Sequence, residues 1–129
     1  MPFRGLCAFL VIAMLGCRRE DAGPGSADAA AGFPATPAAL RAGERTYEAR
    51  CAGCHGSRGI GTEQGPPLVH RIYEPGHHSD AAFHLAATRG VSAHHWGFGD
   101  MPPVTDVTPG EVTAIVSYVR WLQRQAGIR

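Results

Sequence analysis

The segment Cys51-Ala52-Gly53-Cys54-His55 combines two closely spaced thiols with an imidazole that follows the second one directly. On a helix this spacing puts the cysteines about one turn apart, so that both sulfurs can bond to neighbouring vinyl groups of one porphyrin. The adjacent imidazole, when neutral, can ligate the iron through a ring nitrogen. The segment therefore predicts the covalent attachment of one c-type haem, and the fold has to enclose a large apolar group.

Two other kinds of site use a Cys-x-x-Cys pair. A redox dithiol of the thioredoxin kind follows a strand in a βαβ unit, and a structural zinc site needs four ligands, usually from a second Cys or His pair at close spacing. Neither context surrounds Cys51 and Cys54. The other cysteines, Cys7 and Cys17, lie in the apolar N-terminal stretch, so that no pair is left for a disulfide.

The N-terminus has the pattern of an export signal. Arg4 precedes an uncharged run over residues 6–15, which is shorter than the about 20 apolar residues that span a bilayer. Met14-Leu15-Gly16-Cys17 resembles a bacterial lipoprotein signal, except that Leu, Val or Ile is usual at the position of Met14. We expect residues 1–16 to be the signal peptide, with lipid on Cys17; the alternative is an ordinary signal cleaved nearby. Both predict an exported protein, either anchored by lipid facing the periplasm or soluble there.

The chain after the signal divides into a tether and one domain. Residues 17–36 are mostly Ala, Gly, Pro, Ser and Asp, and such a segment has too little to bury to offset the entropy of ordering. We expect a flexible tether there. Residues 37–129 suffice for a single domain. Because a small domain buries a low fraction of its surface, a porphyrin would supply apolar volume that its own side chains lack.

The periodicity predicts an all-α domain with about three main helices. The first covers residues 38–52 and delivers the haem motif. The second starts at Ser79 or Asp80 and is stopped by Gly90. The third starts with a capping box in Thr108-Pro109-Gly110-Glu111 and ends near Gly127. An apolar stripe follows its length: Val112, Ile115, Val116, Val119 and Leu122.

Residues 38–126 resemble class I cytochrome c, and the haem motif is the first matching feature. In the helix before it, Gly43 and Tyr47 correspond to the family's small residue and aromatic that pack against the last helix. Three short segments correspond to the family's Gly-Pro-x-Leu loop, its axial methionine followed by proline, and the aromatic part of its final helix: Gly65-Pro66-Pro67-Leu68, Gly99-Asp100-Met101-Pro102-Pro103 and Ile115-Val116-Ser117-Tyr118-Val119.

The resemblance implies a class I cytochrome c fold around one haem c, which Cys51 and Cys54 attach. It implies that His55 and Met101 ligate the iron, and that the carbonyl of Pro66 accepts a hydrogen bond from the other ring nitrogen of His55. Met101 could instead fill the core. However, it is the only methionine left after signal removal, and it lies in a loop rich in Gly and Pro.

Several other polar residues have more than one interpretation. A bis-His haem would take His94 or His95 as its distal ligand in place of Met101. The pairs His77-His78 and His94-His95 are interpreted as solvated loop residues, with a weak metal site as the alternative. Trp96 and Arg71 are candidates to hydrogen-bond the haem propionates, since their side chains only donate; either could equally be a rim residue.

The charge pattern narrows the function. All 12 basic residues are arginines, and removal of Arg4 with the signal leaves as many arginines as acidic residues, which number 11. A nucleic-acid partner is not expected, because such proteins present a net basic face. The chain also lacks a lysine-rich docking ring, so that redox partners would meet an arginine-dotted or apolar surface.

The resemblance thus implies a one-electron carrier rather than an enzyme, working between periplasmic or membrane redox proteins such as a dehydrogenase, an oxidase or a bc-type complex. Two alternatives belong to other classes. One is a sensor or catalyst for gases or peroxide with a labile distal ligand, and the other is a dedicated subunit of a larger dehydrogenase or oxidase.

Overall fold

The computed structural model describes Met1 and residues 32–129. The expected signal peptide, the lipidation site at Cys17 and most of the expected tether lie outside these residues. The described part is helical, and its regular elements are η1 (Ala38–Leu40), α2 (Arg41–Arg50), α3 (Ala52–His55), η2 (Ser57–Gly59), η3 (Arg71–Tyr73), α4 (Asp80–Arg89) and α5 (Pro109–Gln125). The predicted all-α class is confirmed. Within the described residues, none of the helices has the length and apolar content that crossing a bilayer requires.

The first predicted helix is divided into shorter pieces. Pro37 precedes the 3₁₀ turn η1, after which α2 runs as a regular helix to Arg50. At Cys51 the backbone has φ −119° and leaves helical geometry, and α3 follows as a separate single turn. The amide of His55 still bonds to the carbonyl of Cys51 at 2.9 Å. The haem motif therefore lies at a bend in the chain and not on one straight helix.

The start of α5 confirms the predicted capping box. The Thr108 hydroxyl accepts from the amide of Glu111, and the Glu111 carboxylate accepts from the amide of Thr108 at 2.8 Å. Two of the four amides that a helix start leaves unpaired are satisfied in this way. All five residues of the predicted apolar stripe are buried.

The second predicted helix also forms, but its start is stabilised differently. Ser79 precedes α4 without a hydrogen bond from its side chain. The carboxylate of Asp80 instead accepts from the guanidinium of Arg120 on α5 at 2.7 Å. Gly90 ends α4 with a φ of 75°. None of the residues of α4 is fully buried, so its apolar side chains are only partly covered by the rest of the described protein.

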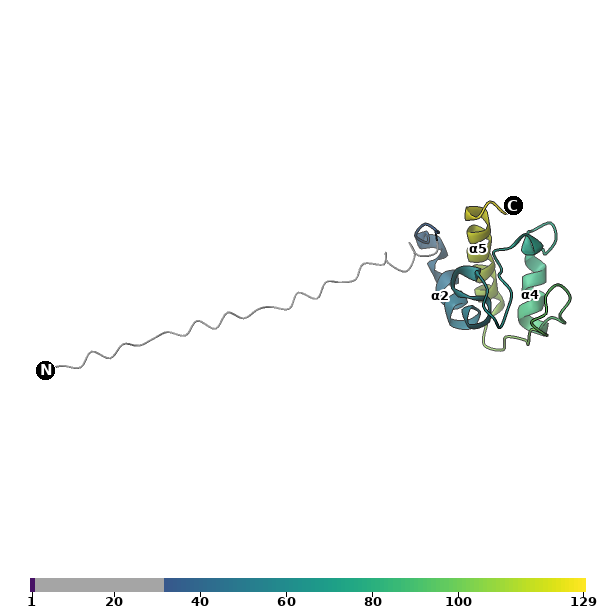
Figure 1. The fold of residues 1–129 in the computed structure, drawn as a ribbon, viewed down its shortest axis with the longest axis horizontal. Helices are drawn as coiled ribbons and strands as arrows, with labels where there is room; N and C mark the ends of the chain where they lie inside the picture. Colours follow the sequence, from purple (N-terminus) through teal and green to yellow (C-terminus); the bar gives the residue numbers. More distant parts are fainter. Residues whose placement is uncertain (2–31) are drawn as a thin grey trace.

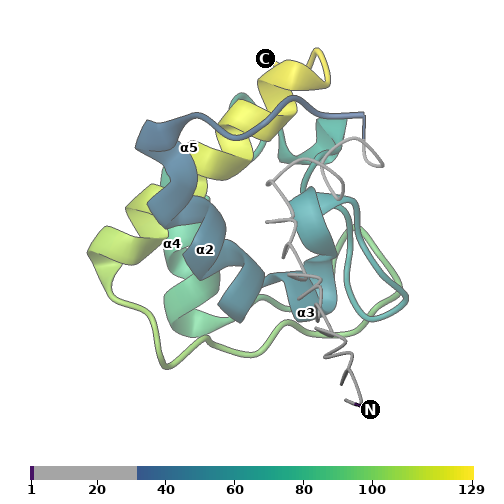
Figure 2. The same ribbon diagram turned by 90° about the vertical axis from the view of Figure 1, so that its left-hand side faces the viewer.

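The helix α5 lies between α2 and α4 (Figure 1), and it contacts both of them. In the view turned by 90°, α2 crosses α5 (Figure 2). A Cβ atom at Gly43 of α2 would collide with the carbonyl oxygen of Ala114, which shows how closely the two backbones approach. The packing reason that the sequence suggested for a glycine in mid-helix is therefore present.

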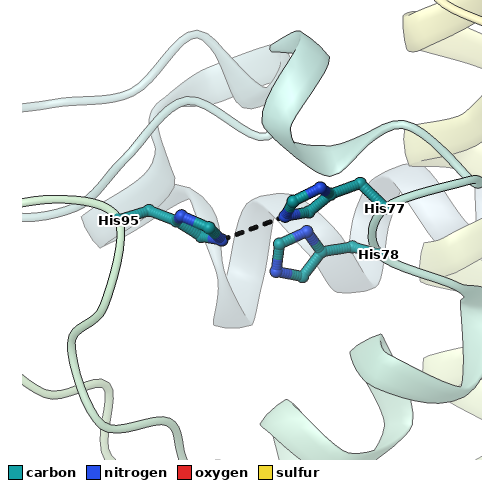
Figure 3. Close-up of side chains that lie close together, drawn as sticks. All are labelled: His77, His78 and His95. Carbon is teal, nitrogen blue, oxygen red and sulfur yellow. Dashed lines mark hydrogen bonds between the residues drawn. The ribbon is translucent and has the colours of Figure 1, made fainter.

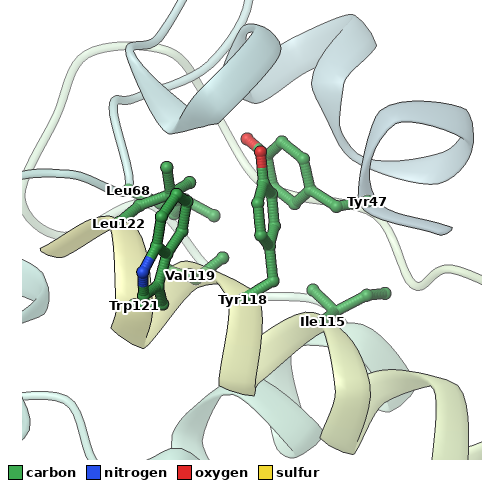
Figure 4. Packing of buried hydrophobic residues seen from close by; sticks show 7 residues of the cluster. All are labelled: Tyr47, Leu68, Ile115, Tyr118, Val119, Trp121 and Leu122. Carbon is green, nitrogen blue, oxygen red and sulfur yellow. The ribbon is translucent and has the colours of Figure 1, made fainter. Parts of the chain in front are cut away.

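The hydrophobic core fills the space around this crossing (Figure 4). The rings of Tyr47 and Tyr118 lie 5.6 Å apart between their centroids, and both side chains are completely buried. Most of the other core side chains come from α5: Ile115, Val119, Trp121 and Leu122. Leu68, from the loop between η2 and η3, completes the cluster. The core is thus centred on α2 and α5, and Phe83 of α4 packs against it.

Two buried polar residues of α5 hold the long loop before α4. Arg120 donates to the carbonyls of Tyr73 and His78, and its guanidinium lies 4.8 Å from the centre of the Phe83 ring. Gln123 donates to the carbonyl of Leu68 at 2.8 Å. A buried guanidinium is tolerated only when its donors are satisfied, and the loop carbonyls do this.

The last residues of the expected tether contact the domain. Thr36 is buried, and its hydroxyl donates to the carboxylate of Glu44 at 2.6 Å. The guanidinium of Arg58 lies 5.8 Å from the centre of the Phe33 ring. Folded structure therefore begins before residue 37, because one aromatic ring and one hydroxyl are enough to attach this short segment.

Candidate functional site

A cavity of about 380 Å³ opens between α4, α5 and the loops that flank α4. Cys51, His55, Pro66, Trp96 and Met101 all line it, although they come from segments far apart in the sequence. Cys54 and Arg71 do not line it. A volume of this size is within the about 300–1,000 Å³ range of cofactor and ligand sites.

The two cysteines of the motif differ in their surroundings. Cys51 is half-buried at the cavity wall, whereas Cys54 is exposed. Burial raises the pKa of the Cys51 thiol to about 11, and the nearby Cys54 and Glu48 add to the shift. A redox dithiol needs the opposite, a lowered thiol pKa. In the described residues the motif also follows a helix and not a strand, which argues against the thioredoxin interpretation.

His55 ends α3 with its ring directed by a backbone carbonyl. Its Nδ1 lies 2.9 Å from the carbonyl oxygen of Pro66. Because a carbonyl can only accept, Nδ1 carries the proton in this bond and Nε2 is left with its lone pair. Burial lowers the pKa of His55, and the bond to Pro66 partly opposes that shift. Burial thus favours the neutral imidazole, and the bond to Pro66 fixes the tautomer that leaves Nε2 available to a metal.

The loop that carries Pro66 is held tightly against the motif. The Tyr47 hydroxyl donates to the carbonyl of Gly56 at 2.8 Å, and the amide of Gly61 donates to the carbonyl of His55 at 2.7 Å. At Gly65 a side chain would come within 2.9 Å of the carbonyl oxygen of Cys54. Only glycine permits this approach, and the Pro66 carbonyl is placed by it.

Met101 is fixed through its backbone. It forms an isolated antiparallel bridge with Val91, in which both hydrogen bonds measure 2.9 Å. Its side chain is half-buried at the cavity. The alternative ligands His94 and His95 also line the cavity, but they are exposed. The structure therefore gathers all three candidates on one side of the site, and only Met101 is anchored by a backbone pairing.

The two candidate propionate donors lie in different places. The indole Nε1 of Trp96 is buried and has no hydrogen-bond partner among the described residues. It is near the Tyr73 hydroxyl: burial raises the pKa of Tyr73, and the indole opposes that shift. Arg71 is exposed and lines a separate depression with Glu74 and the C-terminal residues. The indole Nε1 of Trp96 thus lies at the cavity without a hydrogen-bond partner among the described residues, whereas Arg71 lines a different depression.

The residues present fit a haem. Apolar side chains of α4 and α5 form much of the wall, which suits an apolar ring system, and the side chains of α4 are only partly buried by the described residues. The donor set is two thiols, one imidazole and one thioether, which are the groups that attach haem c and ligate its iron. A buried indole N–H without a partner is costly, and a carboxylate of the bound group would satisfy it.

Fold and site together define an all-α haem-binding protein. Comparison with known families supports this: the Cytochrome c family model matches residues 40–123, a range that includes the motif, the Pro66 loop and Met101. The chain belongs to the cytochrome c family, as a class I c-type cytochrome. Membership implies covalently bound haem c and haem-based electron transfer. None of the curated proteins matches the chain.

Sequence reasoning missed several residues that shape the site. Phe83 and Leu85 of α4 and Phe98 of the following loop line the cavity, and their apolar character was the available signal. Arg120 and Gln123 hold the loop from outside the cavity. Two polar residues within the apolar face of a helix are a signal that the sequence contains. The loop carbonyls that they bind could not be predicted from it.

Proposed function

We propose that this cytochrome c is a monohaem one-electron carrier with His55 and Met101 as the axial ligands. The observation that carries the proposal is that both side chains line the same apolar cavity as Cys51. Haem, when bound, supplies the exchange of one electron between ferric and ferrous iron. A thioether ligand favours the ferrous state and raises the reduction potential.

The chain's own residues supply the remaining requirements of a carrier. The Pro66 carbonyl orients the ring of His55, and burial lowers the pKa of His55, which favours the neutral form that ligates iron. The apolar wall from α4 and α5 keeps water from the site. With both axial positions filled by the protein, no position remains for a substrate, which favours a carrier over an enzyme.

An apolar rim supports docking of a redox partner. Leu85 and Phe98 line the cavity, and their exposed fractions are 51% and 40%. Exposed apolar side chains at a site's edge are suited to brief contacts that need little electrostatic steering. Dehydrogenases, oxidases and bc-type complexes are the partners we propose, in the periplasm or at its membrane.

A direct test is the chemistry and spectrum of the purified protein. After extraction with acidified acetone the colour should stay with the polypeptide, and mass spectrometry should find one added haem. The ferric protein should be low-spin with a weak near-infrared sulfur-to-iron charge-transfer band, and the ferrous protein should bind CO slowly. A second haem, or extractable haem, would contradict the monohaem assignment.

The same measurements separate the carrier from its alternatives. Five-coordinate iron or rapid CO binding by the unmodified protein would identify a gas or peroxide site. Stable co-purification with a dehydrogenase or oxidase would identify a dedicated subunit.

We further propose that Cys17 carries lipid and anchors the domain to a membrane that faces the periplasm. Replacing Cys17→Ser should release a soluble, haem-loaded protein from the membrane fraction, because haem attachment depends on Cys51 and Cys54 only. Cys7→Ser serves as the control, since Cys7 lies within the expected signal. Membrane fractionation unchanged by Cys17→Ser would assign the attachment to the domain instead.

A further inference from the structure

Three histidines from two loops converge beside the cavity (Figure 3). His77 and His78 precede α4, and His95 follows it. One ring nitrogen from each lies within 4.8 Å of the others, and the Nε2 atoms of His77 and His95 are 3.3 Å apart. Figure 3 shows the three rings turned toward a common point. None of them belongs to the haem motif.

The loop bearing two of these histidines is fixed independently of any ion. The amides of His77 and His78 both donate to the carbonyl of Glu74, at 3.0 Å and 2.8 Å. Arg120 of α5 donates to the carbonyl of His78. The backbone that carries the two rings is therefore set by the fold, which lowers the cost of ordering this loop on binding.

The ring of His78 is also oriented for ligation. Its Nδ1 donates to the carbonyl of Ile72 at 2.6 Å, which leaves Nε2 as the free nitrogen. Metal-bound histidines characteristically make this kind of hydrogen bond to a backbone carbonyl, because it fixes the tautomer and the ring direction.

The observed spacing matches one class of ion. In a tetrahedral site with metal–nitrogen bonds of about 2.0–2.1 Å, two ligand nitrogens are about 3.3–3.4 Å apart. The 3.3 Å separation of His77 and His95 equals this value, while His78 needs a small inward movement. Imidazole selects Zn²⁺, Cu²⁺ and Ni²⁺, whereas Mg²⁺ and Ca²⁺ prefer oxygen ligands.

We propose that His77, His78 and His95 form a second metal site, separate from the haem iron, for a divalent transition metal of the Zn²⁺ class. Three protein ligands leave the fourth position open. His94 stands next to His95: its ring centre is 4.3 Å from that of His95, and its Nδ1 donates to the carbonyl of Ser92 at 2.8 Å. The site goes beyond electron transfer and requires only that His95 is not the distal ligand of the iron.

The test uses the full holoprotein, purified without a polyhistidine tag. Zn²⁺ is added in a calorimetric titration, and equilibrium dialysis with metal analysis gives the stoichiometry. We expect one Zn²⁺ per chain and no binding of Mg²⁺ under the same conditions. The double variant His77→Ala/His95→Ala should bind Zn²⁺ at least about 10- to 100-fold more weakly, the range known for the loss of an orienting partner alone.

His84→Ala is the matched control. His84 is on α4 outside the cluster, where its Nε2 lies 3.4 Å from the Thr113 hydroxyl, and its loss should leave the affinity unchanged. Equal affinity in the double variant and the wild type would overturn the proposal, as would an equal loss in His84→Ala. Covalent haem content and circular dichroism check folding, and the single variant His95→Gln replaces the double variant if folding fails.

One measurement distinguishes this site from haem ligation. The absorption spectrum of the ferric protein should not change when Zn²⁺ binds or when His95 is replaced. A spectrum that changes with His95→Gln would make His95 an iron ligand and would overturn the second site.

Discussion

A single carbonyl oxygen fixes the orientation and the tautomer of the His55 imidazole. Pro66 accepts from Nδ1, and the short approach of Gly65 to Cys54 keeps that carbonyl in place. Met101 is held by two backbone hydrogen bonds to Val91. Both proposed ligands are thus positioned by contacts with the main chain, which leave Nε2 of His55 and the sulfur of Met101 available to the iron.

Replacement of Met101 tests the distal ligand. In Met101→Ala the midpoint potential should fall on the order of 0.1 V or more, since axial ligands shift haem potentials over about 0.8 V. The near-infrared band should disappear and the ferrous protein should bind CO rapidly. Redox titration and stopped-flow absorption measure these changes. Covalent haem should remain, because Cys51, Cys54 and His55 are intact.

His94→Ala and His95→Ala are the controls for this variant. Both should keep the wild-type potential and spectrum. If Met101→Ala keeps the wild-type potential and spectrum while one histidine variant changes them, that histidine is the distal ligand.

At the scale of elements, the crossing of α2 and α5 depends on the absence of a side chain at Gly43. A methyl group there meets the Ala114 carbonyl, which is backbone and cannot rotate away. We expect Gly43→Ala to lower the free energy of unfolding by about 1–3 kcal/mol or more, despite the better helix propensity of alanine. Denaturant titration of the holoprotein measures it.

Gly110→Ala is the matched control, because nothing lies within 4 Å of a Cβ atom at that position in the first turn of α5. It should be neutral or stabilising by about 0.4–1 kcal/mol. Equal destabilisation by both substitutions would show that the close crossing is not the cause.

The capping box of α5 gives a prediction with a pH dependence. Thr108→Ala removes the side-chain acceptor and should cost about 1 kcal/mol. Hydrogen bonds from the backbone and side chain of Thr108 lower the pKa of Glu111 below its usual 4.5. A lowered carboxyl pKa stabilises the fold above the unfolded value, and this contribution is lost as the pH falls through the folded value.

The stability difference between wild type and Thr108→Ala should therefore be constant above pH 5 and become smaller in more acidic solution. Denaturant titrations at several pH values measure it. A difference that grows on acidification would contradict the assigned role of the Glu111 carboxylate.

At the scale of the whole molecule, the core and the cavity share part of their lining. The core joins α2 to α5, and two of its residues, Leu68 and Ile115, also line the cavity, as does Phe83 of α4, which packs against the core. Arg120 pairs with Asp80 at the start of α4, and the amide of Val104 donates to the carbonyl of Ala87 near its end. None of the residues of α4 is fully buried, so we expect the bound group to add to its packing.

Cys51→Ser/Cys54→Ser should show this dependence. Without covalent haem we expect the loss of several kcal/mol out of the about 5–15 kcal/mol that stabilise a small domain. Circular dichroism should report reduced helical content, and hydrogen exchange should show α4 protected less than α5. Full protection of α4 in the variant would mean that protein contacts alone hold it.

Local patterns were sufficient for part of this molecule. The haem motif, the capping box at Thr108 and the apolar stripe of α5 each depend on residues a few positions apart, so the sequence contains the whole interaction. The all-α class followed from the same short-range periodicity. The loop prolines and glycines around Pro66 and Met101 have no local interaction that predicts their role. They could be interpreted only because the family has similar loop motifs.

Long-range packing decided the rest. Two sets of contacts join segments separated by a helix or more. Arg120 and Gln123 bind carbonyls of the loop before α4, and His77 and His78 meet His95. Tertiary structure likewise placed Trp96 at the cavity and Arg71 outside it. The sequence by itself determined which groups can attach and ligate a haem, because that chemistry is local. Only the tertiary structure decided which of the distant side chains reach the cavity, because their positions depend on how α4 and the loops are packed onto α5.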